Sequence, residues 1–289
     1  MHTARGVDDP ALAGDGVCAV SRSSLLAGIA AFAAIASPAA AIEAVSGRYE
    51  IMIGGLQVGV AGFEGRISND SYETSVSVRL SGVSRLIASG RGSATASGRI
   101  AGGRAVPANY ALTLNTTQQN EAIRMAMSGG AVRTFSAEPA KPEAPDQVPL
   151  TASHRQGVLD PLAAALFVVA GSGPTVSAEA CARTFPVFDG RQRYDLAFSY
   201  SRTEELKVPG YSGPAVVCNA RYRPIAGHRP AQTQGMEQNR DMQIWLAPVA
   251  GTRALVPARI MIRTPVGMAQ IEPTKLELGS PTSTASINR

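Results

Sequence analysis

Alternation of apolar and polar residues is the feature that most restricts the fold of this chain. It begins near Gly47 and returns every 8–14 residues, with short turns between the alternating segments. A period of two predicts strands with one buried face, and regularly spaced strands of this kind predict an antiparallel sheet. Glycines inside several segments indicate bulges. We therefore expect a mainly β fold with a strongly curved sheet, either an open barrel or a β-spiral.

The expected strands are residues 49–53, 56–67, 72–80, 87–100, 110–115, 121–127, 132–136 and 214–222, with a last hairpin of 242–246 and 257–262 that continues to 276. Asp189-Gly190 is the turn dipeptide of a two-residue hairpin, whose second arm begins near Tyr194. Residues 223–240 are polar and contain glycine and prolines, so we expect a mobile loop there.

Residues 161–170 are predicted to form the central helix. Asp160 can cap it, Pro161 suits its first position, and Gly171 stands where helices often end. The segment contains only uncharged, apolar side chains. A helix that is apolar all round is buried, so we expect the sheet to wrap around it.

Within this helix Leu162, Leu166 and Val169 would share one face, while Phe167 would point away from them. Residues 138–149, with four prolines, form an extended connector that enters the helix. The helix would therefore act as a plug between two β halves.

The N-terminal residues are typical of a secretion signal. An apolar run over 25–36 follows Arg22 and precedes small residues that suit cleavage after Ala41. A buried N-terminal helix is the alternative. The run is too short to span a bilayer, and no other run is long enough. We expect cleavage of residues 1–41, release into the periplasm by the general secretory route, a single domain over 42–278 and a flexible tail over 279–289.

Two cysteines, Cys181 and Cys218, remain after the predicted cleavage site. In an exported protein such a pair predicts one disulfide. Two unpaired buried thiols are the alternative. A metal site is less favoured, because neither cysteine has a histidine or a second cysteine at ligand spacing.

The formal net charge is +5, and 27 basic residues include only three lysines. The arginines are spread along the chain without a basic run, so nucleic-acid binding is not predicted. Arg191 and Arg193, at positions i and i+2, could bind an anion, although a solvated face is the simpler interpretation. Trp245 could line a cavity or fill the core.

No catalytic constellation is apparent. His154 and His228 lie in polar surroundings, and no nucleophile elbow, phosphate-binding glycine loop or set of metal ligands is present. Paired carboxylates could be assembled from Asp160, Asp189, Asp195 or Glu272, as in many β proteins. We therefore predict neither an enzyme nor a cofactor.

Four sequence segments stand out as a set: Tyr49…Gly54-Gly55-Leu56-Gln57-Val58-Gly59, Gly157-Val158-Leu159-Asp160-Pro161-Leu162, Phe188-Asp189-Gly190-Arg191-Gln192-Arg193-Tyr194-Asp195-Leu196 and the late Trp245…Pro248…Leu255-Val256-Pro257. Together they resemble an exported bacterial family, the domain-of-unknown-function family numbered 3108. The resemblance covers most of residues 46–276. It implies a periplasmic β protein with a curved sheet around a helix, similar in outline to lipoprotein carriers and receptors, and it implies no settled activity.

Three functions are therefore open. The protein could bind a lipid, an acyl chain or a partner peptide in its curved sheet, or it could maintain the envelope through its surface. An enzyme, such as a hydrolase, of unrecognised type is the third. Apolar volume left between helix and sheet would favour the first. The sequence predicts nothing about oligomeric state.

Overall fold

The computed structural model describes residues 42–80, 90–117 and 119–279, all within the unit Ala39–Arg289. The predicted signal peptide, residues 280–289 of the predicted tail and the first residues of the strand expected at 87–100 lie outside these ranges. Among the described helices, none is long and apolar enough to cross a membrane.

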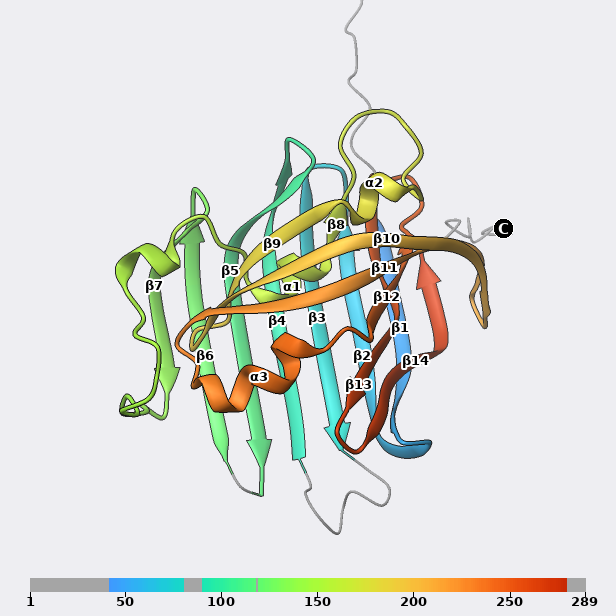
Figure 1. Ribbon diagram of the computed structural model, residues 1–289. Coiled ribbons are helices and arrows are strands. Elements are labelled where there is room, and N and C mark those ends of the chain that lie inside the picture. The colour runs from blue at the N-terminus through green and yellow to red at the C-terminus, as the bar shows by residue number, and fades with distance from the viewer. Residues whose placement is uncertain (1–41, 81–89, 118, 280–289) are drawn as a thin grey trace, which may run out of the picture. The chain divides into compact units, whose positions relative to one another are not determined.

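Within the described ranges, fourteen strands form one antiparallel sheet (Figure 1). They are β1 Glu43–Ile53, β2 Leu56–Ile67, β3 Ser71–Leu80, β4 Gly90–Ala101, β5 Arg104–Thr116, β6 Asn120–Ser128, β7 Ala131–Glu138, β8 Phe167–Val168, β9 Arg183–Phe188, β10 Arg193–Val208, β11 Tyr211–Ala226, β12 Met242–Pro248, β13 Ala254–Thr264 and β14 Gly267–Leu278. The order runs from β7 to β1, then from β14 to β9, and β8 pairs with β13. The sheet does not close, since β7 and β9 end the path. The predicted mainly β, antiparallel fold is confirmed.

Glycine pairs set the tight turns of the first half. Gly54-Gly55, Gly102-Gly103 and Gly129-Gly130 all have positive φ, and they join β1 to β2, β4 to β5 and β6 to β7. Two consecutive positive φ values suit the two-residue hairpin turns whose twist matches that of the strands. Register shifts interrupt several ladders, including β1–β2 and β4–β5, as expected for a sheet with glycine-rich strands.

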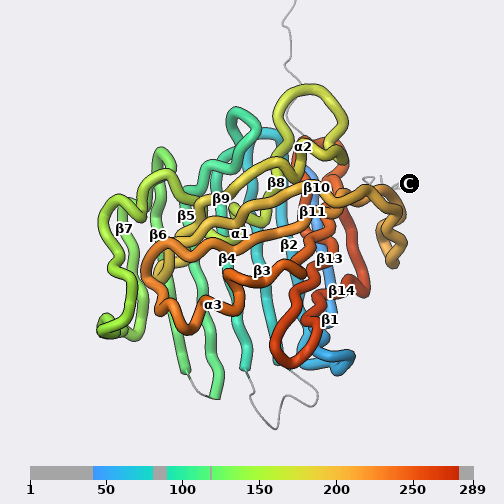
Figure 2. The backbone as a smooth tube through the Cα atoms, in the orientation of Figure 1, coloured from blue at the N-terminus to red at the C-terminus, as the bar shows by residue number. Residues whose placement is uncertain are grey.

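Two hydrophobic cores lie on opposite sides of β12. The first core packs the inner face of β1–β6 against residues of β9–β13 and contains Tyr110 and Trp245. The second core contains Phe167, Cys218 and Leu246. Figure 2 shows β9–β11 running across β2–β6, which places the second half of the sheet over the first. Strand β12 is therefore buried on both faces.

The predicted helix 161–170 is wrong in its length. Helix α1 spans only Pro161–Ala165, and Phe167–Val168 is strand β8, paired with β13. Leu166 and Val168 enter the first core, whereas Phe167 and Val169 enter the second. Val169 therefore faces away from Leu166, contrary to the helical prediction. A strand buried on both faces is apolar throughout, and periodicity cannot distinguish it from a buried helix.

The expected loop over 223–240 is also wrong. Strand β11 extends to Ala226, and helix α3 occupies Pro230–Gln238 with Pro230 in its first turn and no buried residue. Two further short helices, a 3₁₀ turn Ala152–Arg155 and α2 Ala178–Cys181, were not predicted. Such short or wholly exposed helices have no apolar stripe by which a sequence could reveal them.

Candidate functional site

An apolar cavity of about 200 Å³, here called the inner pocket, lies between α1, β1–β3 and β13–β14. Its walls carry Ile51, Phe63, Val76 and Val78 from the sheet and Leu162 from α1. These side chains are only partly buried. A volume of this size slightly exceeds the roughly 150 Å³ cavity that accepts benzene in another protein. The inner pocket can therefore take a narrow apolar group.

The apolar wall of the inner pocket continues along the sheet. Val76 lies opposite Ala94, which lies opposite Leu112, and Val78 is followed in the same way by Gly92 and Leu114. Cross-strand partners share a face of the sheet. Leu112 and Leu114 are partly exposed. A chain longer than the cavity could therefore extend over this face.

Thr74 supplies a polar group at the inner pocket. The residue is buried and lines the cavity, and its Oγ1 has no hydrogen-bond partner within the described ranges. A buried hydroxyl without a partner costs free energy, because it has lost its water. Sequence alternation placed Thr74, Val76 and Val78 on one strand face, but the cavity depends on α1 and β13 packing over that face.

Asp160 is the N-cap of α1, as predicted, and it is fully buried. Its Oδ1 accepts hydrogen bonds from the backbone N–H of Leu162 (3.0 Å) and of Ala163 (2.9 Å). Its Oδ2 is buried with no partner among the described residues. Burial raises the pKa of Asp160 to about 6, although the backbone hydrogen bonds act in the opposite direction.

The charge of Asp160 acts on the pKa of three tyrosines. Burial, and then the charge of Asp160, raise the pKa of Tyr72 and Tyr110, and burial with the charges of Asp189 and Asp160 raises that of Tyr194. The hydroxyl of Tyr72 is buried without a hydrogen-bond partner in the described part of the chain. Asp160 and the hydroxyl of Tyr72 are therefore polar groups buried among apolar side chains. Ionisation of Asp160 costs free energy in such surroundings.

Asp160→Asn is expected to flatten the pH dependence of stability. Folding raises the pKa of Asp160 from its ordinary value of 3.8 to about 6, so the folded state holds this proton more tightly. The resulting stabilisation is fully present below about pH 4 and is lost as the pH rises through about 6. The loss amounts to at most about 3 kcal/mol, at 1.36 kcal/mol per pKa unit.

Urea unfolding of both proteins at pH 4, 5, 6 and 7.5 measures this effect. The difference in unfolding free energy between variant and wild type should shift in favour of the variant as the pH rises. A difference that stays constant over the range would contradict a buried, proton-holding Asp160. Asn can still accept the cap hydrogen bonds, so loss of capping does not confuse the comparison.

The Asp189-Gly190 hairpin turns where predicted, but its loop has four residues rather than two, because β9 ends at Phe188 and β10 begins at Arg193. Oδ1 of Asp189 accepts from the backbone N–H of Arg191 (2.8 Å) and of Gln192 (2.7 Å). Its carboxylate thus serves the turn, and burial raises its pKa.

The structure does not bring Arg191 and Arg193 together as an anion site. Arg191 donates from Nε to Glu121 Oε1 at 2.8 Å and from Nη2 to a carbonyl, whereas Arg193 pairs with Asp195 at 2.6 Å. Tyr194, next in the chain, packs its ring against Tyr222 at a centroid distance of 5.1 Å. The hairpin therefore uses its charged residues to hold neighbouring strands.

Trp245 fills the first core and is only 2% exposed. Its Nε1 donates to Glu204 Oε1 at 2.6 Å, and the guanidinium groups of Arg202 and Arg259 lie over its ring, each 5.4 Å from the centroid. Burial raises the pKa of Glu204, but the hydrogen bonds from Trp245 and Arg202 outweigh it and lower the pKa. Trp245 does not line the inner pocket.

The predicted disulfide is confirmed. Cys181, the last residue of α2, is joined to Cys218 in β11, with Cα atoms 5.4 Å apart. Both cysteines are fully buried in the second core beside Phe167. The bond therefore holds α2 against β11 within the second core.

The profile of the family described as "Protein of unknown function (DUF3108)" matches residues 48–273, from within β1 to within β14. The chain belongs to this family. The match confirms the resemblance drawn from the four sequence segments. A comparison with curated protein sequences gives no match.

Two solved structures are similar to this DUF3108 chain. The first is a β-barrel-like protein of domain of unknown function DUF1849 from Brucella abortus, with 11% identity and a TM-score of 0.48, covering 82% of this chain and 98% of its own. The second, named "putative lipoprotein", is from Parabacteroides distasonis, with 9% identity and a TM-score of 0.32, covering 81% of this chain and 95% of its own.

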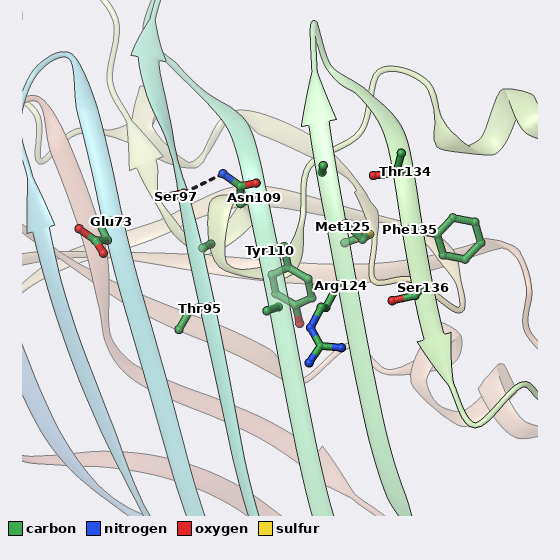
Figure 3. A pocket seen from close by; sticks show the side chains of 13 residues that line it. Glu73, Thr95, Ser97, Asn109, Tyr110, Arg124, Met125, Thr134, Phe135 and Ser136 are labelled. Atoms are coloured by element: carbon green, nitrogen blue, oxygen red, sulfur yellow. Dashed lines mark hydrogen bonds between the residues drawn. The ribbon is translucent and has the colours of Figure 1, made fainter.

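The DUF3108 sheet also carries shallow hollows on its outer face. One hollow, of about 550 Å³, lies over β3–β7. Figure 3 shows its lining side chains, among them the polar Glu73 and Arg124, and the hydrogen bond from Asn109 to Ser97 (3.4 Å). Within the described ranges, no group of three or more His, Cys, Asp or Glu is placed to hold a metal ion. The inner pocket, with its mostly apolar lining, is the better candidate for binding an apolar ligand.

His154 and His228 occupy different segments of the DUF3108 structure. His154 lies in the 3₁₀ turn, where its Nδ1 accepts from the backbone N–H of Thr151 at 3.1 Å. His228 is buried, and its carbonyl accepts from the N–H of Val148 at 2.9 Å. Of the four carboxylates considered from the sequence, Asp195 and Glu272 are each paired with an arginine.

Proposed function

We propose that this DUF3108 protein is a non-enzymatic binding protein of the periplasm that holds an acyl chain, or another narrow apolar group, in the inner pocket. The observation that carries the proposal is the partly exposed apolar lining of that pocket. Apolar side chains that stay partly exposed inside a concave site favour a ligand that covers them. The cavity is too small for a bulky ring system, so a flexible chain fits it best.

Two further features support the proposal. The unpartnered hydroxyl of Thr74 could bond to a carboxyl or ester group of the ligand, which would recover the cost of its burial. The disulfide suits an oxidising compartment such as the periplasm, where a lipid or lipoprotein would be met. A function carried out only by the protein surface would explain neither the cavity nor the buried hydroxyl of Thr74.

Displacement of a fluorescent fatty acid, dansyl-undecanoic acid, tests the proposal. We expect saturable binding to the purified protein and displacement by unlabelled fatty acids. Ala61→Leu fills part of the inner pocket from β2 and should weaken binding by about tenfold or more. Ala126→Leu is the matched control, because Ala126 is also partly buried but lines only the outer hollow of Figure 3.

A second variant tests the polar contact. Thr74→Val keeps the shape of the side chain and should weaken binding of fatty acids by about fivefold, the value of one net hydrogen bond near 1 kcal/mol, without lowering stability. Absence of saturable binding, together with a ligand-free mass in native mass spectrometry, would overturn the acyl-binding function. An equal loss of fatty-acid affinity in Ala61→Leu and Ala126→Leu would show that the inner pocket is not the binding site.

A further inference from the structure

Two hairpin tips lie side by side at one end of the sheet. Gly54, in the β1–β2 turn, donates its N–H to the carbonyl of Met268 at 3.1 Å, next to the β13–β14 turn. A Cβ atom on Gly267 would lie 2.9 Å from Cα of Gly54, so the two turns are in direct backbone contact. Figure 1 shows both tips at the same end of the strands. The contact makes them one continuous surface.

Both tips expose an apolar side chain. Leu56 is 57% exposed and Val266 is 76% exposed, and Ile53 and Met268 beside them are partly exposed. Neither turn contains an acidic residue. A single exposed apolar residue is ordinary, but two on adjoining tips form a patch that water disfavours.

Two arginines on neighbouring strands lie at the same end of the sheet. Arg79 on β3 is directly opposite Arg91 on β4, and both are exposed. Neither makes a salt bridge or hydrogen bond with another described residue. Like charges in directly opposed positions destabilise a sheet, so a bound anion would relieve the repulsion. Guanidinium groups match the geometry of phosphate oxygens.

The arginine pair and the apolar tips are close along the strands. Arg79 is opposite Val60 on β2, four residues from Leu56, which corresponds to roughly 13 Å at 3.3 Å per residue. This separation is one third of the 12-residue length of β2. Both arginines line a hollow of the outer face and lie near the apolar tips along the strands.

We propose that this end of the sheet docks on a phosphate-bearing, anionic lipid bilayer. Leu56 and Val266 enter the boundary of the acyl region, and Arg79 and Arg91 contact lipid phosphates. A soluble phosphate would account for the arginines but not for the two apolar tips. Few apolar side chains are involved, so the binding is reversible and sensitive to salt. The docking surface is separate from the lining of the inner pocket and does not depend on acyl binding.

Flotation with vesicles tests the docking surface. The purified protein, with the same N-terminus in every variant, is mixed with vesicles of equal parts phosphatidylglycerol and phosphatidylcholine, or of phosphatidylcholine alone. We expect the anionic vesicles to bind at least about tenfold more protein than the neutral ones. Arg79→Gln with Arg91→Gln, and Leu56→Ser with Val266→Ser, should each reduce binding by about tenfold.

Matched controls come from the same strands. Arg66→Gln with Arg99→Gln removes two exposed arginines near the other end of β2 and β4, and Ile225→Ser removes an exposed apolar side chain of β11. Both controls should keep binding within about twofold of wild type. Equal loss in controls and test variants would overturn the proposal, as would no binding to anionic vesicles.

Full competition by soluble glycerol phosphate would also overturn docking, since it would identify an anion site rather than a bilayer surface. The fatty-acid assay contains no vesicles, so its result is independent of this one. If the protein binds fatty acid but not vesicles, only the docking proposal fails. If it binds vesicles but not fatty acid, only the acyl-binding function fails.

Discussion

Phe167→Ala is expected to lower the free energy of unfolding by about 3–5 kcal/mol. Phe167 is completely buried at the centre of the second core, where its ring meets Phe185 and Phe198 edge to face at centroid distances of 5.0 and 4.9 Å. The substitution removes both aromatic contacts and leaves a cavity beside the disulfide. Urea unfolding followed by far-UV circular dichroism measures the change.

Phe135→Ala is the matched control. Phe135 is 38% exposed and makes one ring contact, with Phe188, at 6.0 Å, although the guanidinium of Arg155 also covers it. We expect a loss of only about 1–2 kcal/mol, because most of the ring already faces water or a charged group. Similar losses for the two variants would show that Phe167 does not organise a core of its own.

Removing the disulfide is expected to have an effect of similar size. The double variant Cys181→Ala and Cys218→Ala should lose about 3–4 kcal/mol, because the bond closes a loop with a sequence separation of 37 residues. That loop contains β9 and β10, which cross the first half of the sheet. Losing the bond also removes two buried sulfur atoms from the second core.

Unfolding with and without reductant provides the control for this prediction. Reductant should lower the unfolding free energy of the wild type by most of its difference from the double variant. The unfolding free energy of the double variant should not change with reductant. A wild-type protein whose unfolding midpoint does not move with reductant would contradict a stabilising bond. A double variant destabilised by less than about 1 kcal/mol would have the same consequence.

Local features of the chain account for the correct predictions. The period of two in 72–80 reflects a strand with one face on the first core, and β3 forms there. The Asp160–Pro161 pair begins α1, because its backbone preferences and cap hydrogen bonds involve only the next three residues. Cys181 and Cys218 could be paired from the sequence because no other cysteine remained after the predicted cleavage site.

The errors arise where burial comes from both sides. Residues 166–169 form a strand rather than a helix because β13 offers a pairing edge and separate cores accept alternate side chains. The sequence contains the apolar run but not the partner strand, which lies more than 80 residues away. The inner pocket was equally hidden, since its walls come from β1–β3, α1 and β13–β14.

The sequence by itself therefore determined most of the strands, the hairpin positions, the start of α1 and the cysteine pair, because each depends on neighbours in the chain or on composition. Only the tertiary structure decided the end of α1, the second core, the inner pocket and the contact between the two hairpin tips. The end of α1 depends on β8 pairing with β13, and the contact between the tips depends on β1 pairing with β14, elements more than 200 residues apart. Alternation states which face of a strand is buried, but long-range pairing decides what covers it.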